Sequence, residues 1–444
     1  MHIQLLRNHS LFRNEYVKQL AGSLIFKMLM VLASFLLMPL MLKYLGDERY
    51  GIWLTMYSVV SWALFFDCGI GNGVRNKLSE YLEHNRYNEA IKSISSAYVS
   101  IAIISLLIYI LVIIAGQFID WNVIFNTEKI SAREIQNSFL TIFGLFLVNF
   151  VLSIIDQLFH ATKKTEKTVL RSFFSNLFSL ITVYIANVFF DPSLTYLAIA
   201  YGSSLVLSSL LLTISFYSKF PNLIPSIKYF DRDRISEIIN LGGQFFIIQI
   251  AVLVIFTTDK IIIAQVVSPA AVVPYEITIK LFSLVLVFNN LFLNPLWSAY
   301  TRAFARQDIY FIKSTLKKTH VIFVVLSMIS LLIYLLSHTI IDIWMGGRVM
   351  VQESLVLIVC VFIIVRLWCD IYAYFLNGIS KIKVQMYLAV IQATINLPIS
   401  ICLGRKFGVE GVLLGSLISL SLSALVLPLY SHFLIKNFTV RSCV

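Results

Sequence analysis

Long apolar stretches, each bounded by charged or turn-forming residues, recur along the whole chain. A helix needs about 20 apolar residues to cross a hydrocarbon core about 30 Å thick, where no water satisfies the backbone polar groups. Stretches of this kind predict twelve spans, near residues 20–42, 50–66, 93–115, 138–159, 169–190, 194–217, 241–266, 270–296, 319–337, 354–376, 384–403 and 411–435. The pattern therefore predicts an all-α, polytopic membrane protein.

The predicted spans form two sets of six, which can be laid over each other at an offset of about 220 residues. Gly22 opens the first span and Gly242 the seventh. The amphipathic, basic sequences RNKLSEYLEHNRYNEAIKS and WSAYTRAFARQDIYFIKST follow the second and eighth spans. We therefore expect two pseudo-symmetric six-helix lobes, residues 1–218 and 241–444, joined by a cytoplasmic linker at residues 219–240. Transporters with parallel repeats of this kind place a substrate site between the repeats.

Composition and charge agree with this prediction. Of the 444 residues, 59% are hydrophobic and 13% are charged, which is far from the composition of soluble domains. The net charge of +12 follows from topology: with the amino terminus inside, 24 of the 35 Lys and Arg residues fall in cytoplasmic segments, 7 in outer segments and 4 inside spans. Because Lys and Arg concentrate on the cytoplasmic side, both termini are predicted to be cytoplasmic, and no nucleic-acid partner is expected.

The sequence predicts no cofactor and no metal site. The five cysteines lie in or beside apolar runs without paired spacing, so they indicate neither a disulfide framework nor a zinc site. The largest outer connection, residues 117–137, is too short for a soluble domain. Function is therefore expected among the helices.

Charged residues deep inside the predicted spans are candidates for function, because each costs about 2.5–3.5 kcal/mol at the membrane centre unless it has a partner or water. Arg366 lies near the middle of the tenth span, and Asp370 follows one turn later on the same face, where the two can pair. Glu276 and Lys280 form a second pair in the eighth span. Each pair is interpretable as a salt bridge that holds the helix bundle or as a polar site for an anionic headgroup.

Other polar residues lie nearer the ends of the predicted spans. Lys27 enters the first span by only about 10 Å and has a stem long enough to reach the interface. Asp259 and Lys260, near the outer end of the seventh span, fit an interfacial location. A polar stripe in the fourth span indicates a solvated groove or a helix contact rather than a proton relay; its residues are Asn149, Ser153, Asp156 and His160.

The sequence FFDCGIGNGVRNK spaces three glycines two apart: Gly69, Gly71 and Gly73. A nucleotide site would need a strand, a Gly-rich turn and a helix of a soluble α/β unit, whereas this stretch follows a membrane span. Each glycine lowers helix propensity by about 1 kcal/mol relative to alanine, and Asn294 and Pro295 occupy the matching place in the eighth span. The stretch is a candidate hinge and gate, with Asp67 at its cytoplasmic mouth; close helix packing is the alternative.

Four blocks, YLGDERYGIW, FDCGIGNGVRNKL, TDKIIIAQ and PYEITIKLF, make the chain resemble bacterial polysaccharide exporters, most closely O-antigen flippases. The resemblance covers the whole chain in order and topology. It implies a two-lobed transporter of the multidrug, oligosaccharidyl-lipid and polysaccharide exporter superfamily. Such proteins move an undecaprenyl-pyrophosphate-linked oligosaccharide across the bacterial inner membrane for lipopolysaccharide biosynthesis, and the implied partners are this substrate, membrane lipid, a glycan polymerase and the chain-length machinery.

The resemblance also implies roles for individual residues. Buried bases commonly bind the pyrophosphate and sugar in this family, and Arg366 and Lys280, with Lys27 behind them, fit that role. Coupling to protons or sodium through Asp67, Glu276 or Asp370, and drive by the membrane potential, all stay open. Two sets of amides are explained by interhelical hydrogen bonds but could also contact sugars: Asn289, Asn290 and Asn294, and Gln385, Gln392 and Asn396.

Three other functions are weighed against lipid-linked oligosaccharide transport. A drug or organic-cation exporter of the same fold would use the acids to bind the cation, and the buried bases disfavour that substrate. A membrane glycan polymerase or ligase would need converging catalytic residues on a sizeable outer loop, but the outer loops here are short. A structural scaffold would explain the fold but not the intramembrane charges, so we expect a transporter and not an enzyme.

Overall fold

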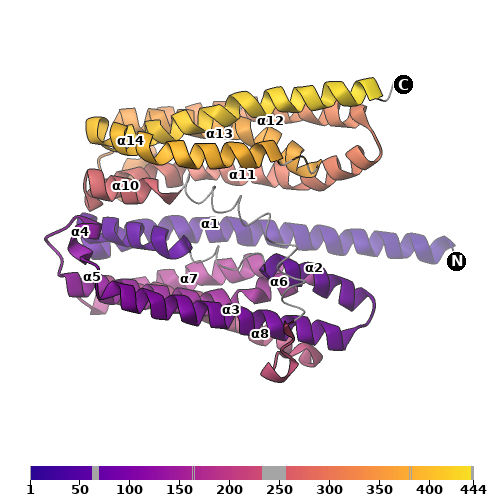
Figure 1. Cartoon of the computed structure of the whole chain (residues 1–444), viewed down its shortest axis with the longest axis horizontal. Helices are drawn as coiled ribbons and strands as arrows, with labels where there is room; N and C mark the ends of the chain where they lie inside the picture. Colours follow the sequence, from indigo (N-terminus) through magenta and orange to yellow (C-terminus); the bar gives the residue numbers. More distant parts are fainter. Residues whose placement is uncertain are drawn as a thin grey trace. The chain divides into compact units, whose positions relative to one another are not determined.

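The computed structural model describes residues 2–62, 70–162, 164, 166–232, 257–379, 381 and 383–441, with side chains between residues 25 and 437 except those of Asn72, Asn76, Ser298 and Ala305. Within these ranges the chain is almost entirely helical and contains no strand (Figure 1). The α-helices are α1 (His2–Ser61), α2 (Ile70–Glu83), α3 (Tyr87–Gly116), α4 (Trp121–Phe125), α5 (Ala132–Leu152), α6 (Ile154–Ala161), α7 (Glu166–Phe189), α8 (Leu194–Tyr217), α10 (Asp259–Val266), α11 (Val272–Ala305), α12 (Ile309–Met345), α13 (Glu353–Gly378) and α14 (Lys383–Arg441). Three short 3₁₀ helices join them: η2 (Pro221–Leu223), η3 (Ile227–Tyr229) and η4 (Pro269–Ala271).

The chain divides into two compact units, Met1–Phe246 and Ile247–Val444. In the first unit, α1 packs on α7, α5 packs on α8, and α2 packs on α3 and α6. In the second unit, α13 packs on α11, α12 and α14, and α10 packs on α14. The described part of the predicted linker, residues 219–232, carries η2 and η3, which pack on α3.

Nine helical segments in the described ranges are long and apolar enough to cross a membrane. Two of these segments contain a break in the helical backbone: Ile25–Ser61, with 37 residues, and Lys383–Asn437, with 55, or about 55 Å and 80 Å of helix. Each contains one glycine with non-helical backbone, Gly46 (φ 73°) and Gly408 (φ 64°). Positive φ suits glycine because it has no Cβ. These glycines lie where the sequence predicts breaks between the first two spans and between the last two.

Two other predicted spans differ from the structure in detail. The predicted fourth span is interrupted at Ser153, between α5 and α6, where the Ser153 hydroxyl donates to the Phe150 carbonyl (2.7 Å). Most of the predicted seventh span lies outside the described residues, and α10 forms its last turns. The structure thus bears out a multi-pass, all-α protein, while the count of twelve spans stays a prediction.

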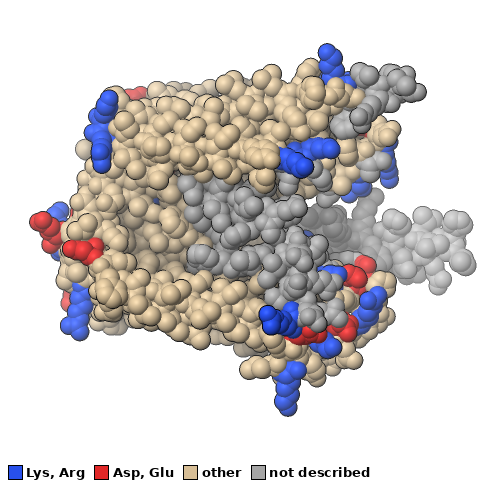
Figure 2. Space-filling model, viewed as in Figure 1, with Lys and Arg blue, Asp and Glu red and all other residues tan. Residues whose placement is uncertain are grey.

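The charges follow the membrane pattern. On the face seen in Figure 2, Lys, Arg, Asp and Glu side chains gather at the ends of the helices, and the surface between the two ends carries none among the described residues. An uncharged band of this kind suits the hydrocarbon core, where every exposed charge is costly.

Two turns agree with the predicted repeat. Asn85 (φ 54°) follows α2, and Gln307 (φ 56°) follows α11, about 220 residues later. In both turns the next residue donates its amide to the carbonyl five residues earlier, at 2.8 and 2.9 Å. The same local geometry therefore recurs at the offset that the sequence predicts.

The candidate hinge positions are helical where they are described. α2 runs through Gly71 and Gly73, and α11 runs through Pro295. Gly69 and Asp67 lie outside the described residues. A hinge at this place therefore stays a prediction.

Candidate functional site

The deep charges of the tenth predicted span lie on α13. Three half-buried residues of α13 follow one another at intervals of four and therefore share one helix face; they are Arg366, Asp370 and Tyr374. Asp370 Oδ2 accepts a hydrogen bond from Asn289 Nδ2 of α11 (2.9 Å), and its carboxylate is also attracted by the positive charge of Arg366. The predicted pair therefore shares a face, and α11 supplies a partner that helix spacing alone could not identify.

The next turn carries an amide and aromatic group. Tyr374 Oη lies 2.8 Å from Asn294 Oδ1 and 3.2 Å from Asn290 Oδ1. The Trp297 ring meets the Tyr374 ring edge to face, with 6.2 Å between the centroids. Trp297 is 39% exposed, and Asn294 is exposed as well. The asparagines of the eighth predicted span do bond between helices, as predicted, but part of the group stays open.

Gly378, the last residue of α13, brings α11 and α13 into close approach. A Cβ at this position would lie 2.6 Å from Tyr300 Cβ and 3.0 Å from the Trp297 carbonyl oxygen. Thr301 Oγ1 donates to the Gly378 carbonyl (2.8 Å), and the fully buried Tyr300 packs edge to face on Phe375. This contact sets the position of Trp297 relative to Tyr374.

Glu276 forms its close ion pair with Lys260, whereas the sequence predicts a pair with Lys280. Glu276 Oε2 lies 2.7 Å from Lys260 Nζ, and the two side chains are only 19% and 20% exposed. Lys280, the partner that the four-residue spacing predicted, is half-buried and acts on Glu276 electrostatically. The tight pair thus joins α10 to α11, because packing places the two helices side by side.

Asp259 is buried inside the second unit, so it is a partnered interior residue, whatever its depth in the membrane. Its side chain is 2% exposed, and its carboxylate accepts hydrogen bonds from Ser416 Oγ (2.8 and 3.0 Å) and Tyr275 Oη (3.1 Å). Ser416 in turn accepts from Asn396 Nδ2 (2.9 Å). The signal that sequence reasoning missed is the serine-rich stretch GSLISLSLSA of α14, which supplies hydroxyls to this buried network.

The polar stripe of the first unit forms a helix contact, one of the two predicted possibilities. Arg171 of α7 bonds Asp156 of α6 through two nitrogens, at 2.9 and 2.6 Å, and both side chains are 16% exposed. Arg171 also donates to Ser209 Oγ of α8 (3.2 Å), which donates to Asn149 Oδ1 of α5 (2.7 Å). One partly buried network therefore joins four helices.

The remaining candidate base lies in the other unit. Lys27 is half-buried on α1, in the first unit, whereas Arg366 and Lys280 belong to the second. The structure therefore unites Arg366 and Asp370 on one face but does not test the grouping of Lys27 with the other two bases.

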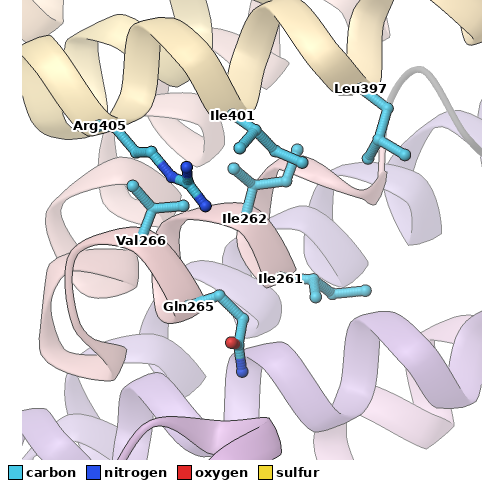
Figure 3. A pocket seen from close by; sticks show the side chains of 7 residues that line it. All are labelled: Ile261, Ile262, Gln265, Val266, Leu397, Ile401 and Arg405. Carbon is cyan, nitrogen blue, oxygen red and sulfur yellow. The ribbon is translucent and has the colours of Figure 1, made fainter.

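A cavity of about 480 Å³ lies between α10 and α14 of the second unit (Figure 3). Ile262 and Ile401 line its middle, the Arg405 side chain points into it from α14, and Gln265 lies at its edge (Figure 3). None of the predicted substrate or coupling residues lines this cavity. The face of α13 that carries Arg366 is therefore a surface separate from the cavity.

Curated relatives support a transport role for proteins of this kind. A Yersinia pseudotuberculosis protein named for O-antigen export is 23% identical over 405 residues, covering 88% of this chain and 90% of that protein. A Salmonella typhimurium protein named as an O-antigen transporter is 23% identical over 400 residues, covering 86% of this chain and 88% of that protein. Both alignments run nearly end to end.

Solved structures share the fold. A multidrug resistance MATE family transporter of the MOP superfamily, in an inward-facing conformation, matches with a TM-score of 0.78 at 12% identity, covering 94% of this chain and 98% of that chain. An outward-facing transporter of the same family and superfamily matches with a TM-score of 0.66 at 13% identity, covering 95% of this chain and 96% of that chain. At this identity the likeness concerns the fold.

The family assignment comes from the sequence profile described as "Polysaccharide biosynthesis protein", which matches residues 17–300. The match includes the first unit from residue 17 onward and continues through α10 and most of α11. Since it spans more than half of the chain, this protein belongs to the polysaccharide biosynthesis protein family.

Proposed function

We propose that this protein moves an undecaprenyl-pyrophosphate-linked oligosaccharide, such as an O-antigen repeat unit, across the bacterial inner membrane by alternating access. In this proposal two six-helix lobes, residues 1–218 and 241–444, rock about a midplane site, with residues 219–240 as their linker and both termini in the cytoplasm. No chemical bond changes, so the protein is a transporter and not an enzyme. The names of the relatives support the substrate class.

The observation that carries the proposal is the position of Arg366. It lies 13 residues after Glu353 and 12 before Gly378 in α13, or about 18–20 Å from either end. This place at the middle of an apolar helix supports a location of its charge near the middle of the membrane. A guanidinium stays protonated there and can bind two phosphate oxygens at once. Lys280, about 12 Å into α11, supplies a second positive charge within the same unit.

Export of an organic cation is the second candidate, and the partners of the acids disfavour it. Glu276 already has Lys260 at 2.7 Å, and Asp370 already has Asn289 at 2.9 Å and the charge of Arg366 nearby. A cationic substrate would have to displace these partners.

Replacement of Arg366 tests the proposal. Arg366→Ala should abolish surface polysaccharide at normal protein levels, because the pyrophosphate loses its bidentate partner, and Arg366→Lys should retain part of it. Arg405→Ala, which removes a guanidinium from the separate cavity, is the matched control and should export normally. Full export by Arg366→Ala would contradict the assignment.

A liposome assay tests transport directly and separates the coupling modes. Purified protein should flip a lipid-linked oligosaccharide without forming polymer, which distinguishes a flippase from a polymerase or ligase. Comparison of pH, sodium and voltage gradients in the same liposomes would show whether Glu276, Asp370 or Asp67 couples transport to an ion.

A further inference from the structure

We infer that four side chains beyond Arg366 form a saccharide subsite, which binds the sugars next to the pyrophosphate. This inference rests on the proposed function and adds where the oligosaccharide lies. We call the group the amide–aromatic row; it consists of Asn290, Asn294 and Trp297 of α11 and Tyr374 of α13.

The chemistry of the row suits a neutral saccharide. An aromatic face packs against the apolar face of a sugar ring, and Tyr and Trp add a polar group at the ring edge. Asparagine amides offer both donors and acceptors to sugar hydroxyls. Trp297 keeps 39% of its surface exposed, and Tyr374 supplies a hydroxyl beside it. Such a mixture of aromatic surface and a few placed polar groups is typical of small-molecule sites.

The amides keep unused hydrogen-bonding capacity. Tyr374 Oη contacts the Oδ1 atoms of Asn290 and Asn294. No residue in the described ranges bonds their Nδ2 groups, so up to four N–H donors are available. Helix adhesion alone would not require them, since Asn289 and the contact at Gly378 already join α11 to α13.

The amide–aromatic row lies on the side of Arg366 that leads toward the C-terminal end of α13. Tyr374 lies eight residues after Arg366 on the same face of α13, or about 12 Å along the helix, and Trp297 packs on Tyr374 on the side of α11. This distance exceeds one pyranose ring. The row can therefore contact sugars beyond the first while Arg366 holds the pyrophosphate, which orients the substrate along α13 from Arg366 toward Gly378.

The row is also held in place before any ligand binds. Trp297 and Thr301 lie one turn apart, and Thr301 Oγ1 is within hydrogen-bond distance of the carbonyls of both Trp297 (3.1 Å) and Gly378 (2.8 Å). The Gly378 contact with Tyr300 fixes the same turn of α11. A prearranged surface loses less conformational entropy on binding, which favours a binding role.

Two probes separate sugar binding from anion binding. Wild-type protein in nanodiscs is titrated with undecaprenyl pyrophosphate, with and without the oligosaccharide made by the host strain. Trp297→Ala and Asn294→Ala should weaken binding of the glycosylated lipid about tenfold, equivalent to about 1.4 kcal/mol, and leave the sugar-free lipid unchanged. Arg366→Gln should weaken both. Tyr387→Ala, which removes a tyrosine that is 61% exposed on α14, should change neither.

Each outcome decides a different question. If Trp297→Ala and Asn294→Ala weaken both probes alike, or neither, the row is a helix contact or an interfacial anchor and the subsite is wrong. The same holds if the wild type binds the two lipids equally. If the wild type binds neither lipid, the proposed function itself fails. Asn294 is exposed, so its alanine variant keeps the test valid even if Trp297→Ala does not fold.

Discussion

Substitution of Gly378 by alanine tests how α11 and α13 are held together. The new methyl group would lie 2.6 Å from Tyr300 Cβ, whereas carbon atoms in contact stay about 3.5–4.0 Å apart. Tyr300 is fully buried against Phe375 and cannot turn away, and the second neighbour, the Trp297 carbonyl oxygen at 3.0 Å, is backbone. The two helices must therefore separate by about an ångström.

The expected cost follows from two opposing effects. Overpacking of this kind destabilises a protein by about 1–3 kcal/mol. Alanine is a better helix former than glycine by up to about 1 kcal/mol, which offsets part of that cost. We expect a net loss of about 1–2 kcal/mol in the free energy of unfolding, together with a weaker Thr301–Gly378 hydrogen bond.

Thermal unfolding of the purified protein in detergent provides the assay. Gly116→Ala is the matched control, because Gly116 is also the last residue of a long helix and a Cβ there would meet a ring carbon of Trp121 at 3.2 Å. A ring that shifts by a few tenths of an ångström relieves that contact, so this variant should melt closer to the wild type. Wild-type melting of Gly378→Ala would refute the close approach of α11 and α13.

Three further predictions concern the other buried contacts and the topology. Asp156→Leu should lower the free energy of unfolding by about 3–5 kcal/mol, because it leaves Arg171 unpaired; addition of Arg171→Met should restore most of the loss, and no recovery in the same melting assay would contradict the pairing. Asp259→Ala leaves two buried hydroxyls without their acceptor, which should lower the free energy of unfolding by about 1–3 kcal/mol for each. Asp259→Asn keeps an acceptor and should melt at a higher temperature than Asp259→Ala; equal melting temperatures would argue against the network. In a cysteine-free background, Glu128→Cys should react with an impermeant maleimide in spheroplasts and Asn85→Cys only after permeabilisation; the opposite labelling would invert the proposed topology.

The helices were largely predictable because each depends on a local property, the length of an apolar run. The predicted span 194–217 coincides with α8 (Leu194–Tyr217). α3 begins at Tyr87, earlier than the predicted residue 93, because its amphipathic first turns continue the helix beyond the apolar run. Two features were not predicted because each depends on a single side chain. The short helix α4 depends on its capping residue, Asp120, and the interruption at Ser153 depends on one hydroxyl hydrogen bond.

The sequence by itself determined the membrane class, the predicted depth of Arg366 and the face that it shares with Asp370, because apolar length and helix period act within one segment. Only the tertiary structure decided the partners: Lys260 for Glu276, Ser416 and Tyr275 for Asp259, and α11 for the polar face of α13. The physical reason is that lipid and protein interior are equally apolar, so the hydrophobic pattern of a membrane helix does not show which side meets a neighbour. The partner of each polar group depends on which helices pack together, and that is a property of the whole fold.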